Sequence, residues 1–137
     1  MKYILILFIS TILFSGCEKT DKVDNEQQWI IKANNQTSLD AELNFFDFDS
    51  QDNNKSFTIT SGTIAELFKG ANGIFELDPI SRKDFDSVLI LFADDKSISY
   101  ILTDTSSFNV LLKDNYERIS DSEYIFNIDN ELYNKAE

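Results

Sequence analysis

Residues 87–103, SVLILFADDKSISYILT, decide the fold that this chain is expected to adopt. Positions 88–92 are apolar throughout, which is typical of a strand covered on both faces. Positions 93–96 form a turn, where aspartate tolerates the left-handed backbone that a tight turn requires. The returning segment places every second residue, from Ile98 to Leu102, on one face. This stretch therefore predicts a β-hairpin in a β-rich domain.

Short segments with the two-residue period of strands lie on both sides of the hairpin. The segments expected to be strands are 29–34, 39–48, 56–60, 74–77, 108–112 and 123–128. Residues 63–69 are ambiguous, because capping-box spacing and Gly70 allow a helix while apolar residues there also alternate. We favour an extended segment, since a helix this short is marginal by itself.

About seven short strands joined by turn clusters predict an all-β fold, specifically an immunoglobulin-like β-sandwich. A small β-barrel is the alternative. The Cys…Trp…Cys framework of antibody domains is absent, so the likeness is one of architecture alone. Residues 129–137 are expected to form a short closing helical turn, with Asp129 or Asn130 as N-cap and with Leu132 and Ala136 on one side.

The first 17 residues, MKYILILFISTILFSGC, predict export of the protein. The apolar run 3–14 would make a helix of roughly 18 Å, which is too short for a bilayer core of about 30 Å. Its end, Phe14-Ser15-Gly16-Cys17, resembles the lipobox of bacterial lipoproteins, in which small residues precede a cysteine. Phe14 stands where leucine is usual in that family.

The lipobox resemblance implies that residues 1–16 are a signal peptide and that Cys17 becomes the first residue, with diacylglycerol on its thiol. The lipid on Cys17 would bind the membrane, residues 17–28 would act as a flexible tether, and residues 29–137 would form a single β-domain. An ordinary signal peptide, or an uncleaved anchor with an incidental cysteine, is the alternative.

Two further motifs occur in the chain. DSVLILFADDKSIS, residues 86–99, has a strand of the type DSVxIxF followed by an acidic turn and a lysine. The tail has the pattern YxFxIxxxxYNxA at Tyr124, Phe126, Ile128, Tyr133, Asn134 and Ala136. Together these motifs resemble those of a group of small lipoproteins of Bacteroidota. The resemblance implies an envelope lipoprotein of the outer membrane and no particular activity. Charged residues soon after Cys17 resemble signals for display on the cell surface, although a plain solvated spacer explains them equally well.

The composition excludes several classes of function. The chain has a net charge of −12, and without residues 1–16 it carries 11 basic and 24 acidic side chains, or −13. Such a chain is repelled by nucleic acid, so no nucleic-acid partner is expected. Histidine is absent and Cys17 is the only cysteine. These absences exclude Ser-His-Asp triads, Cys-His nucleophiles, the usual zinc sites and disulfides within the chain.

One weak candidate for a metal site lies in the loop DFDSQDNNK. Asp47, Asp49 and Asn53 could bind calcium loosely through their side-chain oxygens. The loop is not an EF-hand, because Asp52 stands at the position of the required glycine and Thr58 at that of the bidentate glutamate. A solvated loop between strands is the simpler interpretation, and we expect no cofactor.

Carboxylates could also form a catalytic couple, as in glycosidases, if Asp94 or Asp95 paired with Asp86 or Asp104. Aspartates in turns have a structural role of their own, so the sequence identifies no catalytic residue. A carboxylate-dependent hydrolase of the envelope is therefore the alternative function. A deep pocket containing Asp94, Asp95 or Asp47 would favour it.

Exposed aromatic residues are the weak candidates for a partner site. Phe46 and Phe48 follow Phe45 closely, and one strand cannot bury both faces unless both are covered. If Phe46 and Phe48 are exposed, they mark a partner site. Packing in the core is the alternative. The favoured function is a non-catalytic binding or accessory module, anchored to the membrane, for an envelope protein, a glycan or a small ligand.

Overall fold

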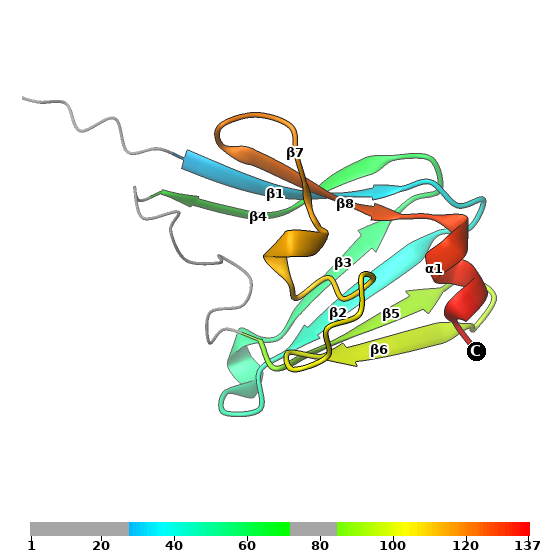
Figure 1. The fold of residues 1–137 in the computed structure, drawn as a ribbon. Helices are drawn as coiled ribbons and strands as arrows, with labels where there is room; N and C mark the ends of the chain where they lie inside the picture. The colour runs from blue at the N-terminus through cyan, green and yellow to red at the C-terminus, as the bar shows by residue number, and fades with distance from the viewer. Residues whose placement is uncertain (1–27, 72–84) are drawn as a thin grey trace, which may run out of the picture.

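Within residues 28–71 and 85–137, the computed structural model forms eight strands in two stacked four-stranded sheets (Figure 1). Sheet A has the order β4 (Ile64–Ala71), β1 (Gln28–Asn35), β8 (Glu123–Ile128), β7 (Glu117–Arg118). Sheet B has the order β3 (Lys55–Ile59), β2 (Ala41–Phe46), β5 (Ser87–Phe92), β6 (Ser97–Ile101). The two sheets stay separate in this part of the chain, so the predicted β-sandwich is confirmed and the barrel alternative is wrong.

The predicted hairpin is β5 and β6, which pair in antiparallel register with Val88 opposite Tyr100. Asp95 in the turn has a positive φ of 69°, the left-handed conformation expected of a turn aspartate. Burial along β5 alternates, however: Val88, Ile90 and Phe92 are buried, while the intervening leucines are only half-buried. The expectation that both faces of this strand are covered is therefore wrong, and sheet B has an outer face open to solvent.

The first and last strands lie side by side at the centre of sheet A. β1 pairs in parallel with β8, with Ile31 opposite Tyr124 and Ala33 opposite Phe126, and antiparallel with β4. Parallel neighbours need a long connection, which here is most of the chain. Of residues 63–69, which allowed either a helix or a strand, all but Thr63 lie in β4, so the extended interpretation is confirmed.

The core fills the space between the sheets with alternate residues from both. Its largest fully buried side chains are Phe45, Phe92, Ile31, Leu43, Ile59, Ile90, Leu111, Ile128 and Leu132. Phe45 is the centre of an aromatic cluster, with ring centroids 5.2 Å from Phe68, 5.2 Å from Phe85 and 5.9 Å from Phe57. These rings come from both sheets, so the cluster holds the two layers together.

The C-terminal helix α1 (Asn130–Lys135) closes one end of the sandwich (Figure 1). The Asp129 side chain caps it by accepting from the backbone N–H groups of Glu131 and Leu132. Leu132 and Ala136 are buried, as the sequence predicts. Glu137 then exchanges two backbone hydrogen bonds with Ser97, of 2.8 and 3.0 Å, and so covers the start of the β6 edge.

The expected strand over 108–112 is wrong. This segment forms turns, because the buried side chain of Asn109 bonds the carbonyl oxygens of Ile101 and Asp104 and accepts from the N–H of Leu111. Local side-chain bonds of this kind compete with pairing in a sheet. β7 and the 3₁₀ helices η1 (Gln51–Asn53) and η2 (Lys113–Asn115) were not expected.

The expected strand over 39–48 is shorter than predicted, since β2 is Ala41–Phe46. The expected edge strand over 74–77, the lipobox and Cys17 lie outside the described residues. Among the helices of the described part, none is long and apolar enough to cross a bilayer.

Candidate functional site

The outward-facing side of sheet B carries very little charge. Alternation with the buried residues places eleven side chains on it, which we call the sheet B face: Glu42, Asn44, Phe46, Ser56, Thr58, Ser87, Leu89, Leu91, Ser97, Ser99 and Ile101. One of the eleven is ionisable, in a chain of which 26% is charged. Ile101 is 54% exposed and the two leucines are half-buried. With Glu42 as its one ionisable residue, the face is an almost uncharged surface on which apolar and small polar side chains predominate.

The outer side of sheet A differs, because polar side chains of β1 and β8 are paired with one another. Lys32 Nζ on β1 lies 2.9 Å from Glu123 Oε1 on β8. Asn34 Nδ2 donates to Asn127 Oδ1 at 3.0 Å, and the Gln36 amide donates to the same oxygen. Cross-strand pairs of this kind satisfy an outer face that remains in water. The sheet B face has one such side-chain pair, from Ser56 Oγ to Glu42 Oε1.

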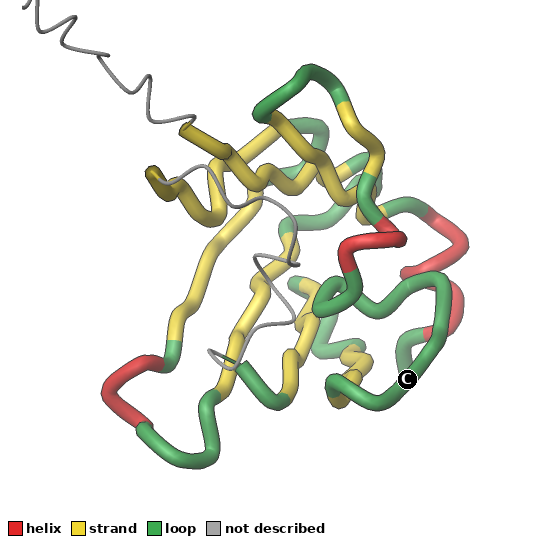
Figure 2. The backbone as a smooth tube through the Cα atoms, turned by 60° about the vertical axis from the view of Figure 1, so that its left-hand side comes forward, coloured by secondary structure: helices red, strands yellow, loops and turns green. Residues whose placement is uncertain are grey.

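A hollow lies at the end of the sheet B face where β2 stops. We call it the Phe48 hollow; its volume is about 310 Å³ and it is lined by Phe46, Asp47, Phe48, Gln51, Asn54 and Ser87. The Phe48 side chain is 72% exposed and Phe46 is half-buried. Figure 2 shows the loop with η1 at one extremity of the domain, away from α1. Exposure of Phe48 agrees with the predicted partner site and not with packing in the core.

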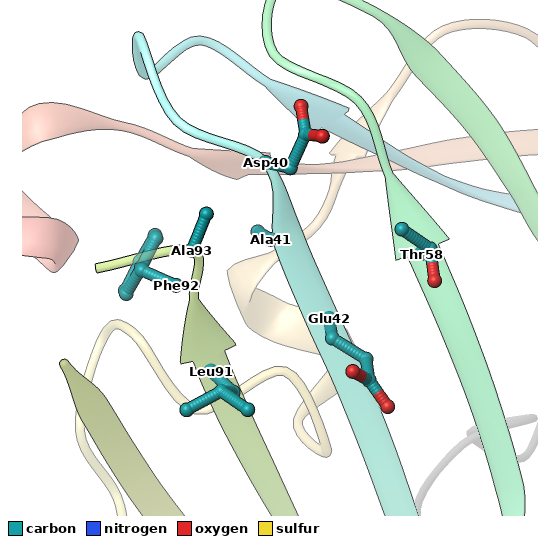
Figure 3. A pocket seen from close by; sticks show the side chains of 7 residues that line it. All are labelled: Asp40, Ala41, Glu42, Thr58, Leu91, Phe92 and Ala93. Carbon is teal, nitrogen blue, oxygen red and sulfur yellow. The ribbon is translucent and has the colours of Figure 1, made fainter. Parts of the chain in front are cut away.

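A second hollow lies at the opposite end of β2 (Figure 3). We call it the Ala93 hollow; it has a volume of about 160 Å³ and is lined by Asp40, Ala41, Glu42, Thr58, Leu91, Phe92 and Ala93. Thr58, Glu42 and Leu91 come from three neighbouring strands of sheet B, and the lining is mostly carbon. The two hollows therefore lie on one face, at its two ends.

Asp47, the first residue of the candidate calcium site, organises the loop itself. Its Oδ1 accepts from the backbone N–H of Asp49 and of Ser50, and its Oδ2 accepts from Asn53 Nδ2 at 2.7 Å. Asp49 thus contributes a backbone group to this network, and its side chain is exposed. Within the described part of the chain, no three acidic, histidine or cysteine side chains are grouped to hold a metal ion.

Asp47 should make the stability of this loop depend on pH. The Asn53 amide, with the N–H groups of Asp49 and Ser50, lowers the pKa of Asp47, although burial acts in the opposite direction. A folded-state pKa below the unfolded value contributes stability above the unfolded value, near 3.9, which is lost as the pH falls through the folded pKa. We expect Asp47→Asn to unfold at lower urea concentration than the parent at pH 6, and the difference to shrink near pH 2. Asp49→Asn is the matched control and should follow the parent; an unchanged Asp47→Asn profile would contradict this.

The aspartates considered for a catalytic couple lie at opposite ends of β5. Asp86 precedes the strand and its main chain bonds Leu102, while Asp94 and Asp95 follow the strand in the turn. Six residues of strand span about 20 Å, well beyond the roughly 5–9.5 Å that separates the two carboxyl groups of a glycosidase. Asp94 and Asp95 therefore do not pair with Asp86, which was one of the two pairings considered from the sequence.

Three of these four carboxylates, those of Asp86, Asp94 and Asp104, also have a structural hydrogen-bond partner. Asp86 Oδ2 accepts from the N–H of Phe48 at 2.8 Å, and Asp104 Oδ1 accepts from the N–H of Ser106. Tyr133 Oη donates to Asp94 Oδ2 at 2.6 Å, which lowers the pKa of Asp94 and raises that of Tyr133. Asp104 lies beyond β6 at the Asp86 end of the hairpin, so it is also remote from the turn.

The sheet B face was not identified from the sequence as a site. The sequence nevertheless contains a pattern that could have indicated this face. Serine occupies alternate positions of β6 and leucine alternate positions of β5, where charged residues are usual on an outer face. Comparison of the chain with known protein families, characterised proteins and solved structures found no match. A function for this chain is therefore argued from the residues of the sheet B face and its two hollows.

Proposed function

We propose that this chain is a lipid-anchored protein of the bacterial envelope whose β-sandwich acts as a non-catalytic binding module. The observation that carries the proposal is the sheet B face: an almost uncharged surface with a hollow at each end, one of which is lined by the 72% exposed Phe48. Exposed apolar patches framed by polar residues mark interaction sites in soluble domains. Sheet A, with its paired outer side chains, has no comparable face in the described residues.

The anchor rests on Cys17 and the apolar run before it. Each buried acyl CH₂ contributes about 0.8 kcal/mol, and stable anchoring takes more than one chain. Two or three chains on Cys17 hold the domain at the outer membrane without a spanning helix. With residues 17–28 as a tether, the sheet B face can meet a partner in the same membrane or outside it. The anchor is compatible with a domain on the cell surface and with one in the periplasm.

The anchor is tested by Cys17→Ser in the full chain. We expect the variant to leave the outer-membrane fraction, because no thiol remains to be acylated. Ser15→Thr is the matched control, which leaves the cysteine in place and should fractionate with the parent. Immunoblots of soluble and membrane fractions report both. A Cys17→Ser chain that stays in the outer membrane would show that something other than lipid holds it.

A further inference from the structure

We infer that residues 129–137 form a latch on the outer edge of β6, which opens as a unit while the two sheets stay folded and so controls whether another chain can pair with that edge. The latch consists of α1 and the residues that flank it. Figure 1 shows α1 against the end of the β5–β6 hairpin. This device is independent of the binding role of the sheet B face.

The register of the hairpin defines the outer edge of β6. The N–H of Phe92 donates to the carbonyl oxygen of Lys96 at 2.8 Å, immediately before β6 begins. Hydrogen-bonded pairs alternate along an antiparallel ladder, so the main-chain groups of Ile98 and Tyr100 face β5 and those of Ser97 face outward. Outward N–H and C=O groups of an edge strand are a template on which another chain can pair.

The latch occupies this template. The N–H of Ser97 donates to the carbonyl oxygen of Glu137 at 2.8 Å, and the N–H of Glu137 donates back at 3.0 Å. At the other end of β6, the carbonyl oxygen of Ile101 accepts from the N–H of Asp104 and from the side chain of Asn109. Both ends of the outer edge are therefore covered, which is one way in which proteins prevent unwanted strand pairing.

The two covers differ in how firmly they are held. Asn109 is fully buried, and its side chain makes three hydrogen bonds to the main chain. In contrast, α1 has six residues, too few for a helix that is stable by itself, and the latch buries the side chains of Leu132 and Ala136 alone. Local opening is favoured where few apolar side chains are buried and hydrogen bonds are exposed to solvent. The latch is therefore the cover that opens.

Tyr133 fastens the latch to the hairpin. Its Oη donates to Asp94 Oδ2 at 2.6 Å, and its ring meets that of Phe92 edge-on, with centroids 5.1 Å apart. Lys96 Nζ lies 4.7 Å from the centroid of the same ring. These three partners closely precede Ser97 in the chain, so Tyr133 couples the position of α1 to the cover on the edge. Release of Tyr133 and exposure of the Ser97 main chain are parts of one opening.

Hydrogen exchange of the detergent-solubilised full chain, followed by NMR at single amides, tests this. The N–H groups of Ser97 and Glu137 report the latch, and that of Leu43, in the middle of β2 with a strand on each side, reports unfolding of the sheets. We expect Ser97 and Glu137 to have equal protection factors, roughly 100-fold below that of Leu43. Protection of Ser97 equal to that of Leu43 would overturn the inference, because the edge would then open only when the domain unfolds.

Tyr133→Phe removes the hydroxyl and keeps the ring. We expect Ser97 and Glu137 to exchange about 3- to 10-fold faster in this variant, the effect of losing one hydrogen bond from the closed state. Ser56→Ala is the matched control, because it removes another hydroxyl that donates to a carboxylate, that of Glu42. Its strand, β3, stays folded when the latch opens, so the exchange of Ser97 and Glu137 should not change.

Leu132→Ala separates opening of the whole latch from fraying of Glu137 by itself. Leu132 is fully buried in the closed latch, so its truncation should speed the exchange of Ser97 and Glu137 at least ~30-fold. If Glu137 frays while α1 stays in place, neither Leu132→Ala nor Tyr133→Phe affects Ser97. Faster exchange of Ser97 in both variants is the expected result, and an unchanged rate in either one would overturn the inference.

Discussion

Replacing Phe45 with alanine is expected to lower the free energy of unfolding by about 3–5 kcal/mol, the usual cost of removing a buried ring from a core. Phe45 is fully buried and its ring contacts those of Phe57, Phe68 and Phe85, which come from or adjoin both sheets. Alanine would leave a cavity that four surrounding strands cannot close. The free energy of unfolding of such a domain is only about 5–15 kcal/mol, so the variant should be markedly less stable than the parent.

Urea unfolding followed by the fluorescence of Trp29, the only tryptophan, measures this loss. Phe48→Ala removes the same side chain from an exposed position and should change the stability by less than about 0.5 kcal/mol. Phe45→Leu keeps most of the side-chain volume and should lower the free energy of unfolding by less than about 1.5 kcal/mol. It can be compared with Phe48→Ala if Phe45→Ala fails to fold. Equal midpoints for Phe45→Ala and Phe48→Ala would contradict the packing described.

The second large effect is expected from Asn35→Ala. The Asn35 side chain is fully buried where β1 ends and joins sheet A to sheet B. Its Nδ2 donates to the carbonyl oxygens of Leu39 and Ile59, at 2.8 and 2.9 Å, and its Oδ1 accepts from the N–H and the hydroxyl of Thr37. Alanine removes all four of these hydrogen bonds. The Leu39 carbonyl and the Thr37 hydroxyl keep the bond that they make to each other, whereas the Ile59 carbonyl and the Thr37 N–H lose this side chain as a partner, at about 1–3 kcal/mol each where water cannot enter.

We therefore expect Asn35→Ala to lower the free energy of unfolding by about 2–4 kcal/mol. Gln36→Ala is the control, because its neighbouring side chain makes one exposed hydrogen bond, to Asn127, and should change stability by less than about 0.5 kcal/mol. Denaturation in urea under the same conditions compares the two. A loss below about 1 kcal/mol for Asn35→Ala would mean that water replaces the lost bonds.

The hairpin over 87–103 was predictable because its strands and its turn are adjacent in sequence. A continuous apolar run indicated the first strand and period-two patterning the second, and Asp95 takes the left-handed conformation that the turn composition suggested. The parallel pairing of β1 with β8 could not be predicted, since the two strands are about ninety residues apart and their register follows from packing. Sequence patterns within a short segment indicate its secondary structure, whereas the order of strands in a sheet depends on packing across the whole core.

Two errors have identifiable physical causes. The segment 108–112 has the composition of a strand, but Asn109 satisfies main-chain groups with its side chain and holds the backbone in turns. The leucines of β5 suggested a strand covered on both faces, whereas Leu89 and Leu91 lie half-buried on the outer face of sheet B. An apolar residue on an outer face looks in the sequence like one in a core.

The candidate site was predictable only in part. Phe48 was considered as an exposed aromatic, and it is 72% exposed. The carboxylates were considered for chemistry, and they serve as hydrogen-bond acceptors within turns, as Asp47 does for Asp49, Ser50 and Asn53. The neutral face itself needs the registers of four strands before its residues can be assembled, because it combines alternate positions from 42–58 and 87–101.

The central claim is that the anchored domain uses the sheet B face for binding, and side-chain footprinting in native membranes tests it most directly. Labelling of Leu91, on that face, and of Phe48, in the hollow at its end, is compared with labelling of Ile64 and Ile119, which are 59% and 51% exposed elsewhere. We predict that Phe48 and Leu91 are labelled less in membranes than in the dilute, detergent-solubilised chain, while Ile64 and Ile119 are labelled equally in both. Equal labelling of all four residues in the two states would contradict the account.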